Sequence, residues 1–135
     1  MADRFIYLVD DNPAHRTLVR RAIVKAKLPY SFCESGSLLE ARKQLFSSTA
    51  TVLDIALLVL DLNLIDGRGS TLIAEIRASS GYKALPILVL STSGLETDVN
   101  ECLTNGANRY LTKSDDITVF TEQICEAVAA LLSGL

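Results

Sequence analysis

The sequence has few of the residues that build zinc or disulfide sites. Its three cysteines, Cys33, Cys102 and Cys125, are odd in number and form no CxxC pair, so neither kind of site is predicted. The first residues, MADRF, contain no apolar segment of the signal-peptide type. Apolar runs such as residues 55–60 are far shorter than the ~20 residues that cross a membrane. We therefore expect a cytoplasmic protein without a membrane segment.

An excess of positive charge is also absent. The chain has 13 Lys and Arg against 16 Asp and Glu, which gives a net charge of -3. Binding to nucleic acid needs a basic surface. The basic residues at positions 16, 20, 21, 25 and 27 fall within one predicted helix, where a solvated face is the simpler interpretation. We expect no contact with nucleic acid.

Strand-like apolar runs alternate with helical patterns along the 135 residues, which predicts one domain. Asn12 and Pro13 are typical of a helix start, and Gly106 is placed to end a later helix. We expect residues 66–69 to form a loop. Alternation of this kind indicates an α/β fold with a parallel sheet and helices on both faces. The predicted strands are residues 5–9, 30–33, 55–60, 87–90 and 109–112.

Polar side chains follow four of these strands. Asp10 and Asp11 end the first, Asp61 the third and Ser91 the fourth, while Lys113 follows the fifth. In a doubly wound sheet the carboxyl ends of the strands share one edge, where ligands bind. Each residue alone has an ordinary surface explanation, but together they place three carboxylates beside one ammonium. Close carboxylates favour a bound cation, and oxygen ligands without His or Cys suit Mg²⁺.

At these residues the chain resembles the receiver domains of two-component response regulators. The resemblance covers nearly the whole chain, and the motifs that carry it are LVDD, LLVLDLN, DG, PILVLSTS and GANRYLTK, in that order. The LTKS ending is most similar to single-domain receivers that work with bacterial phytochrome kinases. The resemblance implies a flavodoxin-like fold of five parallel strands in the order 2-1-3-4-5, flanked by five helices. It also implies that residues 1–135 form one receiver domain, without an output domain.

The resemblance assigns a role to each site residue. Asp61 would be the nucleophile that accepts a phosphoryl group from a kinase histidine. Asp11, Asp61 and the backbone carbonyl of Asn63 would ligate Mg²⁺, and Asp10 would act through a bound water. Lys113 would pair with a phosphoryl oxygen. Beyond Mg²⁺, no cofactor is implied, and the protein would be a switch and not an enzyme.

The resemblance also implies an output. Ser91 would donate a hydrogen bond to the phosphoryl group, and Tyr110 would then move inward. The surface of the fourth helix, fifth strand and fifth helix would change as a result. The implied partners are a sensor histidine kinase, such as a bacterial phytochrome, and a downstream phosphotransfer or effector protein. The apolar sequence AVAALLSGL near the C-terminus suggests an exposed strip that would support a homodimer.

The chain departs from the family pattern at three places. One is Ser91, which keeps the hydroxyl of the usual threonine but lacks its methyl group. The segment at residues 62–66 is shorter than usual between the phosphoacceptor strand and the Asp-Gly pair, which affects the geometry expected of the Asn63 carbonyl. Ser114 stands where a cis-proline commonly follows the lysine. Because a cis bond before a residue other than proline costs about 2.5–4 kcal/mol, this turn is either trans or strained.

Other functions remain as alternatives. A flavin site needs a glycine- and hydroxyl-rich loop after the first strand, and an aspartyl phosphatase needs a D-x-D arrangement there; the sequence DDNPAH provides neither. A receiver-like module that binds proteins without taking phosphate remains open, although such modules normally lose an acid or the lysine. His15, on a basic helix, is interpreted as a solvated side chain.

Overall fold

A computed structural model describes residues 4–46 and 54–133. The described elements, in chain order, are β1 (Phe5–Val9), α1 (Pro13–Lys25), β2 (Ser31–Ser35), α2 (Leu38–Phe46), β3 (Ile55–Asp61), β4 (Asn63–Leu64), β5 (Gly67–Arg68), α3 (Gly69–Ala78), β6 (Ile87–Ser91), α4 (Glu96–Asn105), β7 (Arg109–Thr112) and α5 (Ile117–Ser133). None of the helices within these residues is long and apolar enough to cross a membrane.

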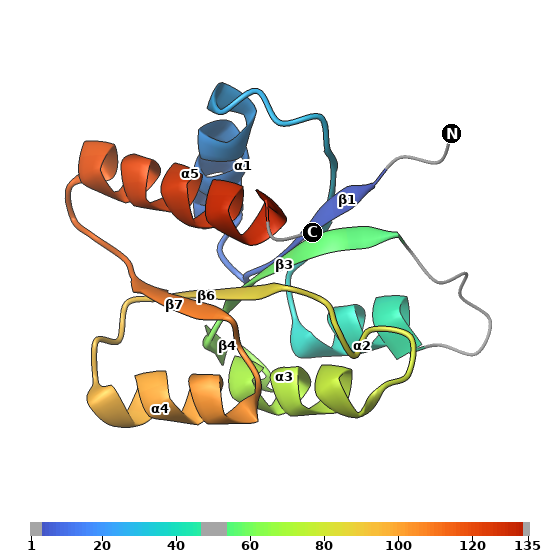
Figure 1. Cartoon of the computed structure of the whole chain (residues 1–135). Helices are drawn as coiled ribbons and strands as arrows, with labels where there is room; N and C mark the ends of the chain where they lie inside the picture. The colour runs from blue at the N-terminus through green and yellow to red at the C-terminus, as the bar shows by residue number, and fades with distance from the viewer. Residues whose placement is uncertain (1–3, 47–53, 134–135) are drawn as a thin grey trace.

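Five of the strands form one parallel sheet in the order β2-β1-β3-β6-β7. This is the predicted 2-1-3-4-5 order, counted over the strands of the main sheet. Helices α1 and α5 cover one face, and α2, α3 and α4 cover the other (Figure 1). The predicted α/β fold is confirmed. β2 lies at residues 31–35 and not at 30–33.

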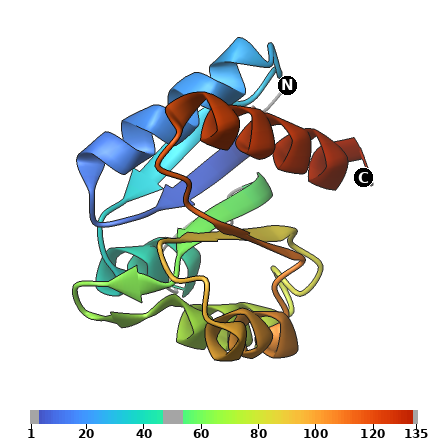
Figure 2. The same ribbon diagram turned by 90° about the vertical axis from the view of Figure 1, so that its left-hand side faces the viewer.

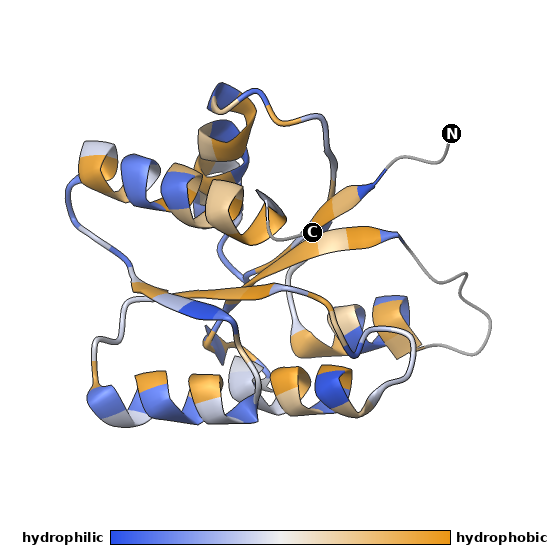
Figure 3. Ribbon diagram, in the orientation of Figure 1, coloured by the Kyte–Doolittle hydropathy of each residue, from blue (hydrophilic) through white to orange (hydrophobic). Residues whose placement is uncertain are grey.

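The sheet separates two hydrophobic cores, because successive side chains of a strand point to opposite faces. Along β1, Ile6 and Leu8 pack with α1 and α5, whereas Tyr7 and Val9 pack with the helices of the other layer. The central strand β3 is buried on both sides over residues 55–60, as its continuous apolar run predicts. Figure 2 shows one helical layer on each side of the sheet. In both layers the helices carry apolar residues on the side toward the sheet (Figure 3).

The start of α1 is fixed by its sequence. The Asn12 side chain accepts hydrogen bonds from the backbone N–H groups of Ala14, at 2.9 Å, and His15, at 3.4 Å. Pro13 is the first residue of the helix, where its missing N–H leaves no hydrogen bond unmade. The helix therefore begins two residues after Asp11 and points its first turn back toward the carboxyl end of β1.

The prediction of a loop at residues 66–69 is wrong. Asn63 and Leu64 pair with Gly67 and Arg68 in a two-stranded antiparallel hairpin, and α3 begins at Gly69. Both carboxylate oxygens of Asp66, at the hairpin tip, accept backbone N–H groups at the start of α2, each at 2.9 Å. The shortened segment therefore folds as a compact hairpin that caps a neighbouring helix.

Within the described residues, the large apolar side chains of the predicted strip near the C-terminus are buried or half-buried, whereas Ala129 and Ala130 are exposed. Val128 and Leu132 lie in the core, and Leu131 packs against it. The large apolar side chains of α5 that are exposed, Ile117 and Val119, lie at its other end. The last two residues of the strip, 134–135, lie outside the described residues.

Gly106 ends α4 with a φ of 119°, a conformation that favours glycine. A Cβ at this position would lie 2.6 Å from Cγ of Arg77. We therefore expect Gly106→Ala to lower the free energy of unfolding by about 1–3 kcal/mol, measured by urea denaturation. Gly81→Ala is the control, because its Cβ would meet nothing closer than 4.0 Å. An equal effect of the two substitutions would contradict the prediction.

Candidate functional site

The carboxyl ends of the strands bring the predicted site residues to one edge of the sheet. β1 delivers Asp10, and its neighbour β3 ends at Asp61. Next to β3, β6 ends at Ser91, whose carbonyl accepts the backbone N–H of Lys113 at 2.7 Å. The loops that follow β6 and β7 lie at the left of Figure 1, at the edge that faces the viewer in Figure 2. The predicted convergence is confirmed.

Asp10, Asp11 and Asp61 form the acidic part of the site. One carboxylate oxygen from each lies within 4.8 Å of the others, a spacing that could hold a metal ion. Asp10 and Asp61 are nearly buried, with side chains that are 11% and 12% exposed, whereas Asp11 is exposed. Because hard divalent ions bind carboxylate oxygens and retain waters, one open and two enclosed carboxylates suit such an ion.

Lys113 supplies the positive charge of the site. Its ammonium donates to Oδ2 of Asp10 at 3.3 Å and to Oδ2 of Asp61 at 3.4 Å. The lysine side chain is only 8% exposed, so these contacts form in a poorly solvated environment. A buried ammonium needs such partners, and here it offsets part of the negative charge of the three carboxylates.

The surroundings of Asp61 disfavour the ionised form of its carboxyl. Burial raises the pKa of its carboxyl above the ordinary value, and the negative charge of Asp10 raises it further. The charge of Lys113 and the hydrogen bond from the Asn63 N–H, at 3.3 Å, act in the opposite direction but do not cancel the effect of burial. A cation bound among these carboxylates would therefore stabilise the ionised form of Asp61.

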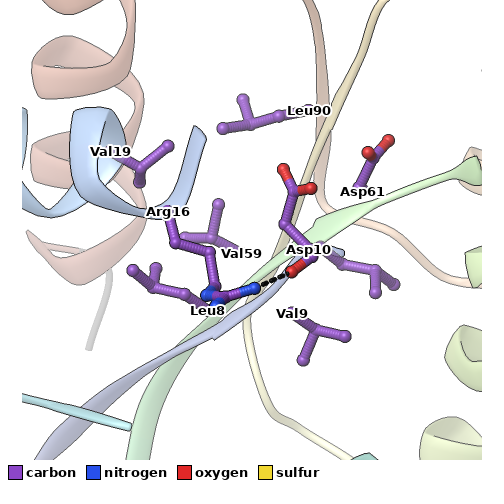
Figure 4. Close-up of a pocket in the computed structure, with 9 residues that line it drawn as sticks. Leu8, Val9, Asp10, Arg16, Val19, Val59, Asp61 and Leu90 are labelled. Atoms are coloured by element: carbon purple, nitrogen blue, oxygen red, sulfur yellow. Dashed lines mark hydrogen bonds between the residues drawn. The ribbon is translucent and has the colours of Figure 1, made fainter. Parts of the chain in front are cut away.

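The space directly beneath the carboxylates is small. A cavity of about 10 Å³ lies among Asp10, Asp61, Arg16 and apolar side chains such as Val19 and Leu90 (Figure 4). That volume holds at most about one water molecule. Arg16 closes its side by donating to the Asp10 carbonyl at 2.5 Å.

Ser91 and Tyr110 are linked through Ser93. Ser91 is fully buried, and its hydroxyl accepts the backbone N–H of Ser93 at 3.2 Å. The half-buried Tyr110 donates its hydroxyl proton to the Ser93 carbonyl at 2.6 Å. A hydroxyl can accept one hydrogen bond while it donates another. Ser91 can therefore donate toward the site without losing its contact with Ser93.

The shortened hairpin brings Arg68 across to α4. Arg68 donates to Asn63 Oδ1 at 3.3 Å, to Asp98 at 2.8 Å and to Glu101. Asp98 also accepts from the Ser93 hydroxyl at 2.5 Å. The sequence did not reveal this polar network. It joins the hairpin after Asp61 to the loop after β6, where the Ser93 carbonyl accepts the Tyr110 hydroxyl.

Gly69 fixes the other end of the hairpin. A Cβ at this position would lie 2.4 Å from the Asp61 carbonyl, and the Gly69 N–H donates to the Leu62 carbonyl at 2.6 Å. Asn63 itself is exposed, and its N–H contacts the carboxylate of Asp61. The shorter segment therefore keeps Asn63 next to Asp61.

The turn after Lys113 contains Ser114. Within the described residues, no peptide bond is cis, so the bond before Ser114 is trans. The Ser114 hydroxyl accepts the backbone N–H of Asp116 at 3.1 Å. Of the two expectations for this turn, the trans form is confirmed.

The interpretation of His15 as a solvated side chain is wrong. Its Nδ1 lies 2.9 Å from the Lys113 ammonium and 3.6 Å from Oδ2 of Asp10. The capped start of α1, immediately after β1, brings this helical turn to the site. The position of this turn follows from the sequence, but the contact of His15 with Lys113 does not. Arg16 and Arg20 are not fully solvated either, because both pair with Glu34 on β2.

A 2-1-3-4-5 parallel sheet with an acidic cluster, a lysine and a buried hydroxyl at its carboxyl edge is the architecture of a signalling receiver. Residues 6–125 match the response regulator receiver domain family. The chain belongs to this family, whose members are receiver domains of two-component response regulators.

Characterised relatives agree with this assignment. The chain is 28% identical over 115 residues to the two-component response regulator ARR17 of Arabidopsis thaliana, covering 80% of this chain and 74% of the relative. It is 26% identical over 130 residues to the chemotaxis protein CheY1 of Helicobacter pylori (strain 26695), covering 96% of each chain.

Two solved structures are similar over nearly their whole length. The phosphorylated cyanobacterial phytochrome response regulator RcpA has a TM-score of 0.85 and 28% identity, covering 100% of this chain and 97% of RcpA. The Mn²⁺-bound form of the response regulator Rcp1 also has a TM-score of 0.85, with 27% identity, covering 97% of this chain and 96% of Rcp1.

The raised pKa of Asp61 predicts a pH-dependent stability difference. The ionised carboxyl costs folding free energy above its folded pKa. That cost disappears as the pH falls to the ordinary pKa of 3.8 and below, because the carboxyl is then protonated in both the folded and the unfolded protein. We expect Asp61→Asn to raise the urea midpoint of the metal-free protein at neutral pH, with a gap that narrows toward about pH 4.

The control for this measurement is Asp115→Asn, at an exposed carboxyl in the turn after Lys113. We expect no comparable gain from that substitution. A midpoint for Asp61→Asn at or below that of the unsubstituted protein at neutral pH would show that the site tolerates the charge of Asp61.

Proposed function

We propose that Asp61 accepts a phosphoryl group from the phosphohistidine of a sensor kinase in a Mg²⁺-dependent reaction. The observation that carries this proposal is the shared contact of the Lys113 ammonium with Asp10 and Asp61, at 3.3 and 3.4 Å. An ammonium beside a nucleophilic carboxylate is placed to pair with the negatively charged group that the carboxylate receives.

Asp61 is the best placed nucleophile of the three carboxylates. It ends the central strand β3, between the strand that carries Asp10 and the strand that carries Ser91. Its Oδ atom would form the new bond to phosphorus as the P–N bond of phosphohistidine breaks, and the donor imidazole would keep the electron pair of that bond. The product would be an aspartyl phosphate that serves as a signal, so the protein would be a switch and not an enzyme.

The donor set fits a hard divalent cation. Asp11, Asp61 and the backbone carbonyl of Asn63 would hold Mg²⁺, with Asp10 acting through a water. When bound, Mg²⁺ supplies positive charge that offsets the negative charge of the carboxylates and of the phosphoryl oxygens. The Mn²⁺-bound form of the similar regulator Rcp1 supports a divalent ion in this cluster.

Ser91 and Tyr110 would convert the phosphoryl group into a change of surface. The Ser91 hydroxyl would donate to a phosphoryl oxygen and shift Ser93, whose carbonyl accepts the Tyr110 hydroxyl. Tyr110 would then move inward and alter the face formed by α4, β7 and α5. Because Arg68 and Asp98 connect to the same loop, α4 would respond with it.

The similarity to RcpA, a phytochrome response regulator, supports a bacterial phytochrome kinase as the donor in the cytoplasm. The phosphorylated state would act on a downstream phosphotransfer or effector protein, or through a homodimer. A receiver-like module that binds proteins without taking phosphate is the alternative. The intact acidic cluster and Lys113 favour phosphorylation over that alternative.

Phosphoryl uptake from acetyl phosphate, read by intact mass, tests this function. We expect a gain of one phosphoryl group that needs Mg²⁺ and is lost in Asp61→Asn, because the amide of asparagine is not a nucleophile for this transfer. Asp115→Asn, at an exposed carboxyl, should take up phosphate like the unsubstituted chain. No uptake by the unsubstituted chain would favour the protein-binding module.

Ser91 is predicted to transmit the signal. Ser91→Ala keeps all three carboxylates and Lys113, so we expect uptake to continue, slowed by about tenfold or less because one hydrogen bond is lost. The response of α4 and β7 amides in ¹H–¹⁵N spectra should be largely lost. Ser91→Thr, which keeps the hydroxyl, is the control and should retain the response. A full response in Ser91→Ala would rule out this route.

A further inference from the structure

His15, the one histidine of the chain, touches the lysine of the site. It is the third residue of α1, and its Nδ1 lies 2.9 Å from the Lys113 ammonium. Its side chain is 38% exposed, so it is only partly solvated. The family roles described above use Lys113 but not this histidine.

The chemistry of the pair fixes which atom donates. A lysine ammonium has three N–H donors and no acceptor. Nδ1 of His15 must therefore accept the hydrogen bond, and the ring proton must be on Nε2. Nδ1 has no proton to donate to Oδ2 of Asp10, 3.6 Å away, so the neighbouring carboxylate is not its hydrogen-bond partner.

The hydrogen-bond acceptors of Lys113 differ in whether the proposed reaction changes their surroundings. Among the residues that the structure describes, the ammonium has three acceptors: His15 at 2.9 Å, Asp10 at 3.3 Å and Asp61 at 3.4 Å. In the proposed function, Asp61 becomes the phosphorylated residue, and Asp10 acts toward the metal through a water. Both carboxylates therefore change their charge environment. The neutral imidazole takes part in neither process, so its hydrogen bond alone need not change.

We propose that His15 is a positioning residue that holds the Lys113 ammonium beside Asp61 during phosphoryl transfer. This role rests on the proposed function and adds a residue to it. The start of α1 is anchored by the Asn12 cap and by the contact of Arg16 with the Asp10 carbonyl. His15 thus presents its acceptor from a fixed backbone, which limits the positions that the flexible lysine can occupy.

Two substitutions of His15 distinguish the effect of its hydrogen-bond acceptor from the effect of its side-chain volume. In His15→Asn the amide oxygen stands the same number of bonds from Cα as Nδ1, so it can accept from Lys113. In His15→Leu a methyl group takes that place and cannot accept. Arg21→Leu, at an exposed position of α1, is the control for a new leucine on this helix.

The first measurement is the initial rate of Mg²⁺-dependent phosphoryl uptake from acetyl phosphate, by intact mass. We expect His15→Leu to be slower by about tenfold, and His15→Asn to recover most of the rate. Arg21→Leu should match the unsubstituted chain. An unchanged rate in His15→Leu, or equal slowing in both His15 variants, would overturn the proposal.

The second measurement needs neither metal nor phosphate. The urea midpoint of the metal-free protein is compared for His15→Leu alone, Lys113→Met alone and the two together. We expect His15→Leu to lower the midpoint when Lys113 is present and to have no such effect when it is methionine. The same loss in both backgrounds would mean that His15 does not act through Lys113 and would overturn the proposal.

The two experiments also distinguish the failure of this role from the failure of the proposed function. If the unsubstituted chain takes up no phosphate, phosphorylation of Asp61 is wrong, and a positioning role in that reaction is wrong with it. If the unsubstituted chain is phosphorylated and His15→Leu keeps its rate, only the role of His15 is wrong.

Discussion

The site depends on one buried positive charge. Asp10, Asp11 and Asp61 gather within 4.8 Å, and two of them lie where water screens their charge poorly. The Lys113 ammonium contacts both enclosed carboxylates, and its own backbone is tied to β6 through Ser91. The order of the strands matters because it brings this lysine, more than fifty residues from Asp61 in the chain, to the same edge.

The sequence predicted the fold because its signals were local and mutually consistent. The continuous apolar run of β3, the Asn12 and Pro13 start of α1 and the Gly106 end of α4 each follow from one feature of the backbone. The site residues could be predicted for a related reason. Parallel strands bring their carboxyl ends together, so polar residues at those ends must converge.

What the sequence did not reveal depends on contacts between distant residues. The hairpin at residues 63–68 is held by Asp66, which caps α2, and by Arg68, which contacts α4. Neither partner follows from local pattern. His15 was misjudged because a lone histidine on a basic helix is usually solvated, whereas here the first turn of α1 lies over the lysine. Helical periodicity predicts which face of a helix a residue occupies, but it does not predict which residue of another element the side chain contacts.

The division of the interior by the sheet has a consequence for how the protein can vary. Side chains of the α1–α5 core and of the α2–α4 core belong to separate clusters, joined through the backbone of the strands. Substitutions in different clusters share no side-chain partners, so their effects on stability are expected to be nearly additive. Each layer can therefore be repacked largely on its own, whereas the strand ends that carry the site are shared by both layers.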